Sequence, residues 1–169
     1  MFYGCTSLAV APALLSRSLA CYCYSGMFSG CTSLTTAPAL PGNEITLAEG
    51  CCKSMFEGCT SLMTAPTFNA TKLAIYCYQS MFSGCTSLTT APGLIATTLV
   101  SHCYYQMFYG CTSLNSINVS FTAWNSSIGA TDGWLFGVSS TGTFTCPSGL
   151  NTGIRSSNYI PSGWTVVKK

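Results

Sequence analysis

The residues of this chain with the most reactive side chains are its thiols. The sequence of 169 residues contains twelve cysteines but only one histidine, one aspartate and three glutamates. His102 directly precedes Cys103, an arrangement that could activate a nucleophilic cysteine. On a helix, however, adjacent side chains point about 100° apart, so we expect His102 to be a partly exposed helical residue. With no phosphate-binding glycine loop, Gly-x-Ser-x-Gly elbow or paired carboxylates, the sequence favours a protein that is not an enzyme.

Most of the cysteines recur at fixed positions and are expected to pack in columns. In a stack of repeated units, one cysteine per unit behaves as a small buried apolar side chain. One column comprises Cys5, Cys31, Cys59, Cys85 and Cys111, and the other comprises Cys23, Cys51, Cys77 and Cys103. Disulfides between neighbouring rungs are sterically conceivable, but identical surroundings argue against selective pairing. Cys21, Cys52 and Cys146 lie outside both columns and are the more oxidisable candidates.

The cysteine spacing does not favour a metal site. Structural zinc sites use pairs of the form Cys-x₂₋₄-Cys, with further cysteine or histidine ligands. Neither Cys21-x-Cys23 nor Cys51-Cys52 has that spacing, and histidine is nearly absent. We therefore expect neither a metal nor another cofactor.

The cysteines belong to a repeat that organises the whole chain. The motif Met-Phe-x-Gly-Cys-Thr-Ser-Leu occurs five times, at successive offsets of 26, 28, 26 and 26 residues. Its copies start at Met1, Met27, Met55, Met81 and Met107. The two additional residues of the second copy fall in the turn-forming stretch Pro41-Gly42-Asn43-Glu44. We predict five repeats over residues 1–133, followed by a degenerate sixth repeat and a C-terminal cap over residues 134–169.

Each repeat is interpreted as one strand and one short helix. Residues 34–40 are partly β-branched and alternate, which favours a strand, and the apolar spacing in 47–56 suits a helix of two to three turns. The glycine of the motif would then follow the helix as its C′ residue. The expected fold is α/β: a right-handed solenoid of about six coils with period 26–28, a parallel strand layer on one face and short helices on the other.

These motifs resemble a known family. Phe-x-Gly-Cys-x-Ser-Leu followed by a short strand is similar to the repeats of BspA-like leucine-rich-repeat surface proteins of gut and oral bacteria. The longer form with Met-Phe and Ala-Pro, together with the terminal Ile160-Pro161-Ser162-Gly163-Trp164-Thr165-Val166, resembles the Bacteroides-type branch. The resemblance spans residues 1–167. It implies a leucine-rich-repeat arc and a role in adhesion or ligand binding at a cell surface.

Composition excludes several classes of partner. Charged residues make up 6% of the chain and the net charge is +2, so the sequence carries no electrostatic signature of nucleic-acid binding. The hydrophobic fraction is 48%, yet no apolar run approaches the roughly 20 residues of a membrane helix. Met1 is already the first residue of a repeat, and no signal peptide is recognised, although an extracellular or cell-surface location is expected.

The candidate binding residues lie on the predicted strand, where alternate side chains face outward. They are the hydroxyl, amide and pyrrolidine groups of Thr36, Pro38, Thr64, Pro66, Thr90, Pro92, Ser116 and Asn118. Solvated strand residues without a ligand are the alternative interpretation. A second candidate surface consists of Tyr22, Tyr24, Tyr76, Tyr78, Tyr104 and Tyr105, which core packing explains equally well.

The leading functional hypothesis is an extracellular recognition or adhesion module that binds a protein or glycan. The alternative is a structural subunit that stacks end to end into a fibre, because the first coil lacks a polar cap and the low charge leaves little repulsion. An ice-binding threonine array is a third hypothesis, which the proline in each strand disfavours. No nucleic-acid partner is expected.

Overall fold

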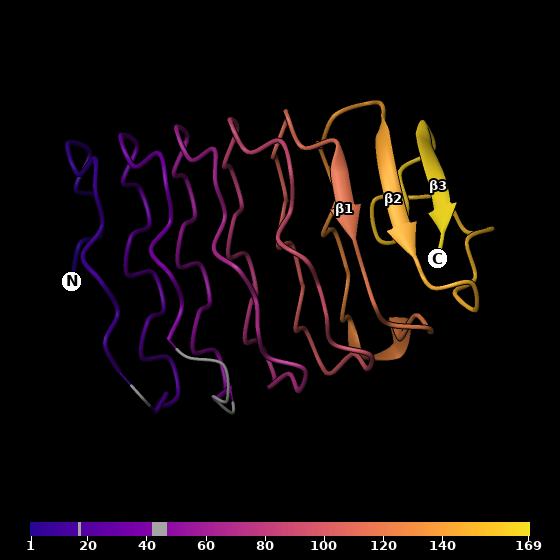
Figure 1. Cartoon of the computed structure of the whole chain (residues 1–169), viewed down its shortest axis with the longest axis horizontal. Helices are drawn as coiled ribbons and strands as arrows, with labels where there is room; N and C mark the ends of the chain where they lie inside the picture. The colour runs from indigo at the N-terminus through magenta and orange to yellow at the C-terminus, as the bar shows by residue number, and fades with distance from the viewer. Residues whose placement is uncertain (17, 42–46) are drawn as a thin grey trace.

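Successive windings of the chain lie side by side along the long axis of the molecule. A computed structural model describes residues 1–16, 18–41 and 47–169. Figure 1 shows the first coil at one end of the stack and the C-terminal strands at the other. The turn-forming insertion predicted at Pro41-Gly42-Asn43-Glu44 lies, apart from Pro41, outside the described residues.

Regular secondary structure is sparse and lies toward the C-terminus. The described residues contain strands β1 (Ser116–Asn118), β2 (Gly142–Cys146) and β3 (Trp164–Lys168), and one 3-10 helix, η1 (Ser126–Ile128). The strands form one parallel sheet in the order β1-β2-β3 (Figure 1). Ile117 of β1 is in register with Phe144 of β2, which in turn pairs with Val166 of β3. The rest of the described chain consists of turns, bends, isolated bridges and extended segments.

The predicted right-handed α/β leucine-rich-repeat solenoid is therefore wrong. The described residues contain no α-helix, and the segment expected to be helical, 47–56, forms a run of turns from residue 49 onward. The predicted strand at residues 34–40 is reduced to one isolated parallel bridge between Thr36 and Thr64. In the part of the chain that the structure describes, no layer of helices covers a layer of strands.

Hydrogen bonding explains why the predicted helix is absent. In an α-helix, each backbone N–H beyond the first turn donates to the carbonyl four residues earlier in the same segment. Here the N–H groups of Cys52, Ser54 and Phe56 donate to carbonyls of the next coil, at 2.8–3.0 Å. The intervening Cys51 and Lys53 donate three residues back within their own coil, at 3.2 and 3.1 Å. Alternate residues thus join neighbouring coils while the others close successive turns.

A left-handed backbone conformation recurs every fourth residue in these turns. In the third coil Gly50, Ser54 and Gly58 have φ of 56°, 53° and 71°. In the fifth coil His102, Gln106 and Gly110 have φ of 52°, 50° and 71°. A left-handed residue interrupts an α-helix, but the turn period of four is close to the helical 3.6. The apolar spacing of this segment therefore indicated a helix that does not form.

Proline limits the strands in the first four coils. A proline has no N–H to donate to a ladder, and the coils with Pro38, Pro66 and Pro92 contain only bridges. In the fifth coil Asn118 occupies the corresponding position, and there β1 forms. The loss of strand structure thus follows the Ala-Pro pair of the repeat.

The core consists of side-chain columns that run through the stack. Phe2, Phe28, Phe56, Phe82 and Phe108 stack with ring centroids 5.6–5.7 Å apart and interplanar angles of 3–9°. Beside them the motif thiols of the second to fifth coils donate to a phenylalanine carbonyl of the preceding coil, as Cys85 Sγ does to Phe56 O at 3.1 Å. The columns therefore combine apolar burial with a repeated polar contact.

The C-terminal residues cover the end of the stack. Trp134 Nε1 donates to Tyr159 O at 2.9 Å, and Trp164 Nε1 donates to Ser139 O at 2.8 Å. Lys168 Nζ donates to the carbonyls of Ser148 and Leu150. Within the described part of the chain, no helix has the length and apolarity needed to cross a membrane.

Replacing a motif glycine tests the left-handed turns. Gly84→Ala places a Cβ 3.6 Å from the backbone of Gly58 at φ 73°, so we expect a loss of about 1–2 kcal/mol in unfolding free energy. Chemical denaturation measures this loss. As a matched control, Gln106→Gly changes a residue that already has φ 50°, and relieved strain and added unfolded-state entropy should offset each other within about 0.5 kcal/mol. Equal losses of unfolding free energy in the two variants would contradict a left-handed turn at Gly84.

Candidate functional site

The predicted strand-side hydroxyl groups form part of an exposed surface. Thr36, Thr64 and Thr90 are exposed and Ser116 is half-buried. The parallel bridges Thr36–Thr64 and Thr90–Ser116 place these residues in register on neighbouring coils. We call Thr36, Thr64, Thr90 and Ser116 the hydroxyl column. Asn118 is exposed as well, and its Oδ1 accepts a hydrogen bond from Lys169 Nζ at 2.6 Å.

The prolines expected beside these hydroxyls do not share their exposure. Pro66 and Pro92 are buried, and Pro38 is half-buried. In the fourth coil Ala91 is buried as well, so two consecutive residues face inward. The segment lacks a ladder that would impose strict alternation, and the prediction that these prolines point outward is therefore not met for Pro66 and Pro92.

The tyrosines separate into core and surface residues. Tyr78 and Tyr104 are buried and stack at 6.2 Å, whereas Tyr22 is exposed and Tyr76 and Tyr105 are half-buried. The Tyr22 hydroxyl donates to Glu49 Oε1 at 2.7 Å, and this hydrogen bond to a carboxylate raises the pKa of Tyr22. Half-buried Tyr24 extends the core, so the six residues do not form one surface.

His102 and Cys103 lie in different surroundings. His102 Nδ1 lies 2.8 Å from Ser101 Oγ, and its ring packs between Tyr76 and Tyr105 at 5.1 and 5.4 Å. Cys103 is fully buried, and burial raises the pKa of its thiol to about 11. His102 is also a left-handed turn residue and not the helical residue that the sequence predicted. A protonated, buried thiol cannot act as a nucleophile.

The thiols divide sharply by exposure. All twelve cysteines are free; Cys5, Cys21 and Cys23 are exposed, and the other nine are buried. Burial raises the pKa of both Cys59 and Cys111 to about 12. Of the three cysteines expected to be more oxidisable, only Cys21 is exposed, because Cys52 and Cys146 lie in the core. Across the described ranges, no group of cysteine, histidine and carboxylate side chains is arranged to hold a metal.

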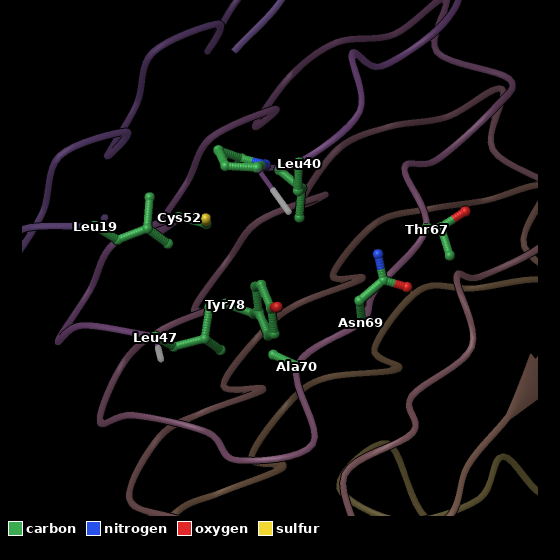
Figure 2. A pocket seen from close by; sticks show the side chains of 9 residues that line it. Leu19, Leu40, Leu47, Cys52, Thr67, Asn69, Ala70 and Tyr78 are labelled. Atoms are coloured by element: carbon green, nitrogen blue, oxygen red, sulfur yellow. The ribbon is translucent and has the colours of Figure 1, made fainter. Parts of the chain in front are cut away.

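A small cavity lies beside Cys52 (Figure 2). Its volume is about 20 Å³, and Leu19, Leu47 and Tyr78 are among the side chains that line it. Cys52 occupies the place in its coil that Tyr24 and Tyr78 occupy in theirs, so the smaller side chain leaves a gap in the column. This space is enough for about one water molecule. We exclude it as a site for an organic ligand.

A larger, open groove lies where the sixth coil meets the C-terminal cap. Its volume is about 280 Å³, and residues 135–140 form one side while residues 156, 157 and 161–163 form the other. Phe136 lines it beside the serines, and none of the lining residues is charged. The sequence predicted a degenerate sixth repeat and a cap in this region but no binding site. The available signal was the exposed aromatic residue Phe136 at a position where the second to fourth coils carry serine or glutamate.

Comparison of the chain with protein-family models, with curated proteins and with solved structures finds no match. The candidate surfaces therefore rest on the geometry of this chain alone. The resemblance to BspA-like surface proteins stays a prediction.

Thiol alkylation tests the partition of the cysteines. At pH 8 we expect iodoacetamide to label Cys5, Cys21 and Cys23 in the native protein, and all twelve cysteines after denaturation. A thiol with a pKa of about 12 is ionised at pH 8 in about one molecule in ten thousand. The rate at Cys59 should therefore rise about tenfold per pH unit as long as the fold persists. Mass spectrometry of tryptic peptides gives the sites, and rapid native labelling of Cys59 or Cys111 would contradict their burial.

Proposed function

We propose that this protein is a non-catalytic recognition module that binds a protein or glycan through the hydroxyl column, at a cell surface or outside the cell. The observation that carries the proposal is the register of Thr36 with Thr64 and of Thr90 with Ser116 on neighbouring coils. Such a row presents the same weak hydrogen-bonding group several times. A repetitive ligand gains affinity from several such contacts at once.

The absence of charge on this row fits an uncharged or weakly charged ligand. Charged residues make up 6% of the sequence, and none of the four residues of the hydroxyl column is charged. Hydrogen bonds between neutral groups contribute modestly, about 0.5–1.5 kcal/mol each. Specific binding through this surface therefore depends on the number of contacts and on their spacing, rather than on any one residue.

The state of the thiols supports a role other than catalysis. Cys103, beside the single histidine, is buried with a pKa of about 11. The proposed cell-surface location rests on the resemblance to BspA-like repeat proteins.

End-to-end stacking into a fibre receives less support from the geometry. The edge strand β3 ends the sheet with Lys168, and Lys169 follows it. Lysine at an edge strand is a common means of preventing strand pairing with another molecule. We therefore expect light scattering to report a discrete particle at high concentration, and long assemblies would favour the fibre instead.

The recognition proposal is tested by removing the hydroxyls without changing side-chain shape. The triple variant Thr36→Val, Thr64→Val and Thr90→Val should bind its ligand at least tenfold more weakly, about 1.4 kcal/mol. The ligand is first sought among neutral glycans and extracellular-matrix proteins by surface plasmon resonance. Because these residues are exposed, each substitution should change stability by less than about 0.5 kcal/mol.

A matched control removes three hydroxyls elsewhere on the coils. Thr60, Thr86 and Thr112 belong to the motif itself and are exposed as well, so their triple valine variant should bind as the unmodified protein does. Equal losses in the two variants, or no binding in either ligand class, would refute a role for the hydroxyl column.

A further inference from the structure

Two exposed aromatic residues at the end of the stack have their rings stacked face to face. Tyr109 and Phe136 occupy the same position in the fifth and sixth coils, where Ser29, Glu57 and Ser83 stand in the second to fourth coils. Their rings lie 5.0 Å apart with an interplanar angle of 13°. Phe136 is 53% exposed and Tyr109 is 41% exposed. Exposed aromatic rings carry an unfavourable hydration free energy that a ligand with an apolar face relieves.

A backbone donor lies next to the Phe136 ring, in the following residue Gly137. In the earlier coils the motif glycine N–H donates to the following coil, as Gly84 does to Tyr109 O and Gly110 does to Phe136 O, both at 2.7 Å. The cap provides Ser157 O as the acceptor for Leu135 N at 3.1 Å. Within the described part of the chain, it provides no acceptor for Gly137 N. The regular ladder therefore ends at the Gly137 N–H, and Gly137 is an exposed residue that lines the groove.

The rest of the groove is uncharged and combines serine hydroxyls with apolar side chains such as Val138 and Pro161. The hydroxyls of Ser140, Ser156 and Ser162 belong to exposed residues that line it. Its volume of about 280 Å³ is close to the lower limit of small-molecule sites, about 300–1,000 Å³. A bound group must therefore be small, neutral and able to exchange hydrogen bonds with hydroxyls while it offers an apolar face to Phe136.

We propose that this groove binds a neutral saccharide. One face of a sugar ring packs on Phe136, and a sugar oxygen accepts the Gly137 N–H. The serine hydroxyls exchange hydrogen bonds with the sugar hydroxyls. An extended peptide fits less well, because strand addition requires an exposed sheet edge, whereas the residues that line the groove belong to no strand. The site is separate from the hydroxyl column and does not depend on that column's function.

The test uses the full chain and a panel of neutral oligosaccharides of glucose, galactose, mannose, xylose and N-acetylglucosamine. Calorimetry measures binding, and two-dimensional amide NMR reports the Gly137 resonance. We expect at least one member to bind and to shift the Gly137 amide. Phe136→Ser should weaken that binding at least tenfold, while Phe136→Tyr, which keeps the ring, should retain it. Folding is not at risk in Phe136→Ser, because Ser29 and Ser83 occupy the same position.

Two controls separate this site from other surfaces. Ile154→Ala removes a 43%-exposed apolar side chain of the same C-terminal region that does not line the groove, and it should leave saccharide binding unchanged. The triple valine variant of the hydroxyl column should also retain it, so that the failure of one proposal does not imply the failure of the other. The saccharide proposal is overturned if no oligosaccharide binds at millimolar concentration or if Phe136→Ser binds normally. It is also overturned if only proline-rich or other peptides shift Gly137.

Discussion

The fold depends on how the backbone N–H groups of each turn segment are divided between two sets of acceptors. Within each turn segment every second N–H donates to the next coil, as the N–H groups of Phe28, Phe56 and Phe82 do at 2.9 Å. The N–H groups of the residues on either side donate to the carbonyl three positions back in their own coil. Both sets are satisfied without a helix and almost without strands. Left-handed residues recur at intervals of four in these segments, and glycine occupies the last of them in each copy of the motif.

The same arrangement gives the cysteine column a specific role. Each phenylalanine carbonyl that accepts a hydrogen bond within its coil has a second lone pair directed toward the following coil. There Cys59 Sγ donates to Phe28 O, and Cys111 Sγ donates to Phe82 O, at 3.1 and 3.0 Å. A thiol can donate only while it is protonated, and burial, which raises its pKa, keeps it so. A small apolar side chain with one weak donor suits this position.

Part of this structure could be predicted from the sequence. The motif identified the repeat period. The expectation that both cysteine columns pack inside is met by all their members except the first of each column, Cys5 and Cys23, which are exposed. The helix prediction failed because a turn period of four places Cys51, Met55 and Cys59 on one side much as a helix does. The strand prediction failed because Pro38, Pro66 and Pro92 interrupt the ladder. The groove beside Phe136 arises from the path of the cap, and no local pattern in the sequence encodes that path.

The ring column has a consequence for how such a chain changes length in evolution. Phe56 stacks on Phe28 and Phe82 with nearly the same separation, 5.6 and 5.7 Å, so one junction between coils is equivalent to the next. Excision of residues 81–106 would bring Phe108 to the place of Phe82 and recreate an existing junction. Duplication of the same segment would do likewise. Unequal recombination between repeats can therefore alter the number of coils, and with it the extent of the outer surface, without requiring any new packing solution.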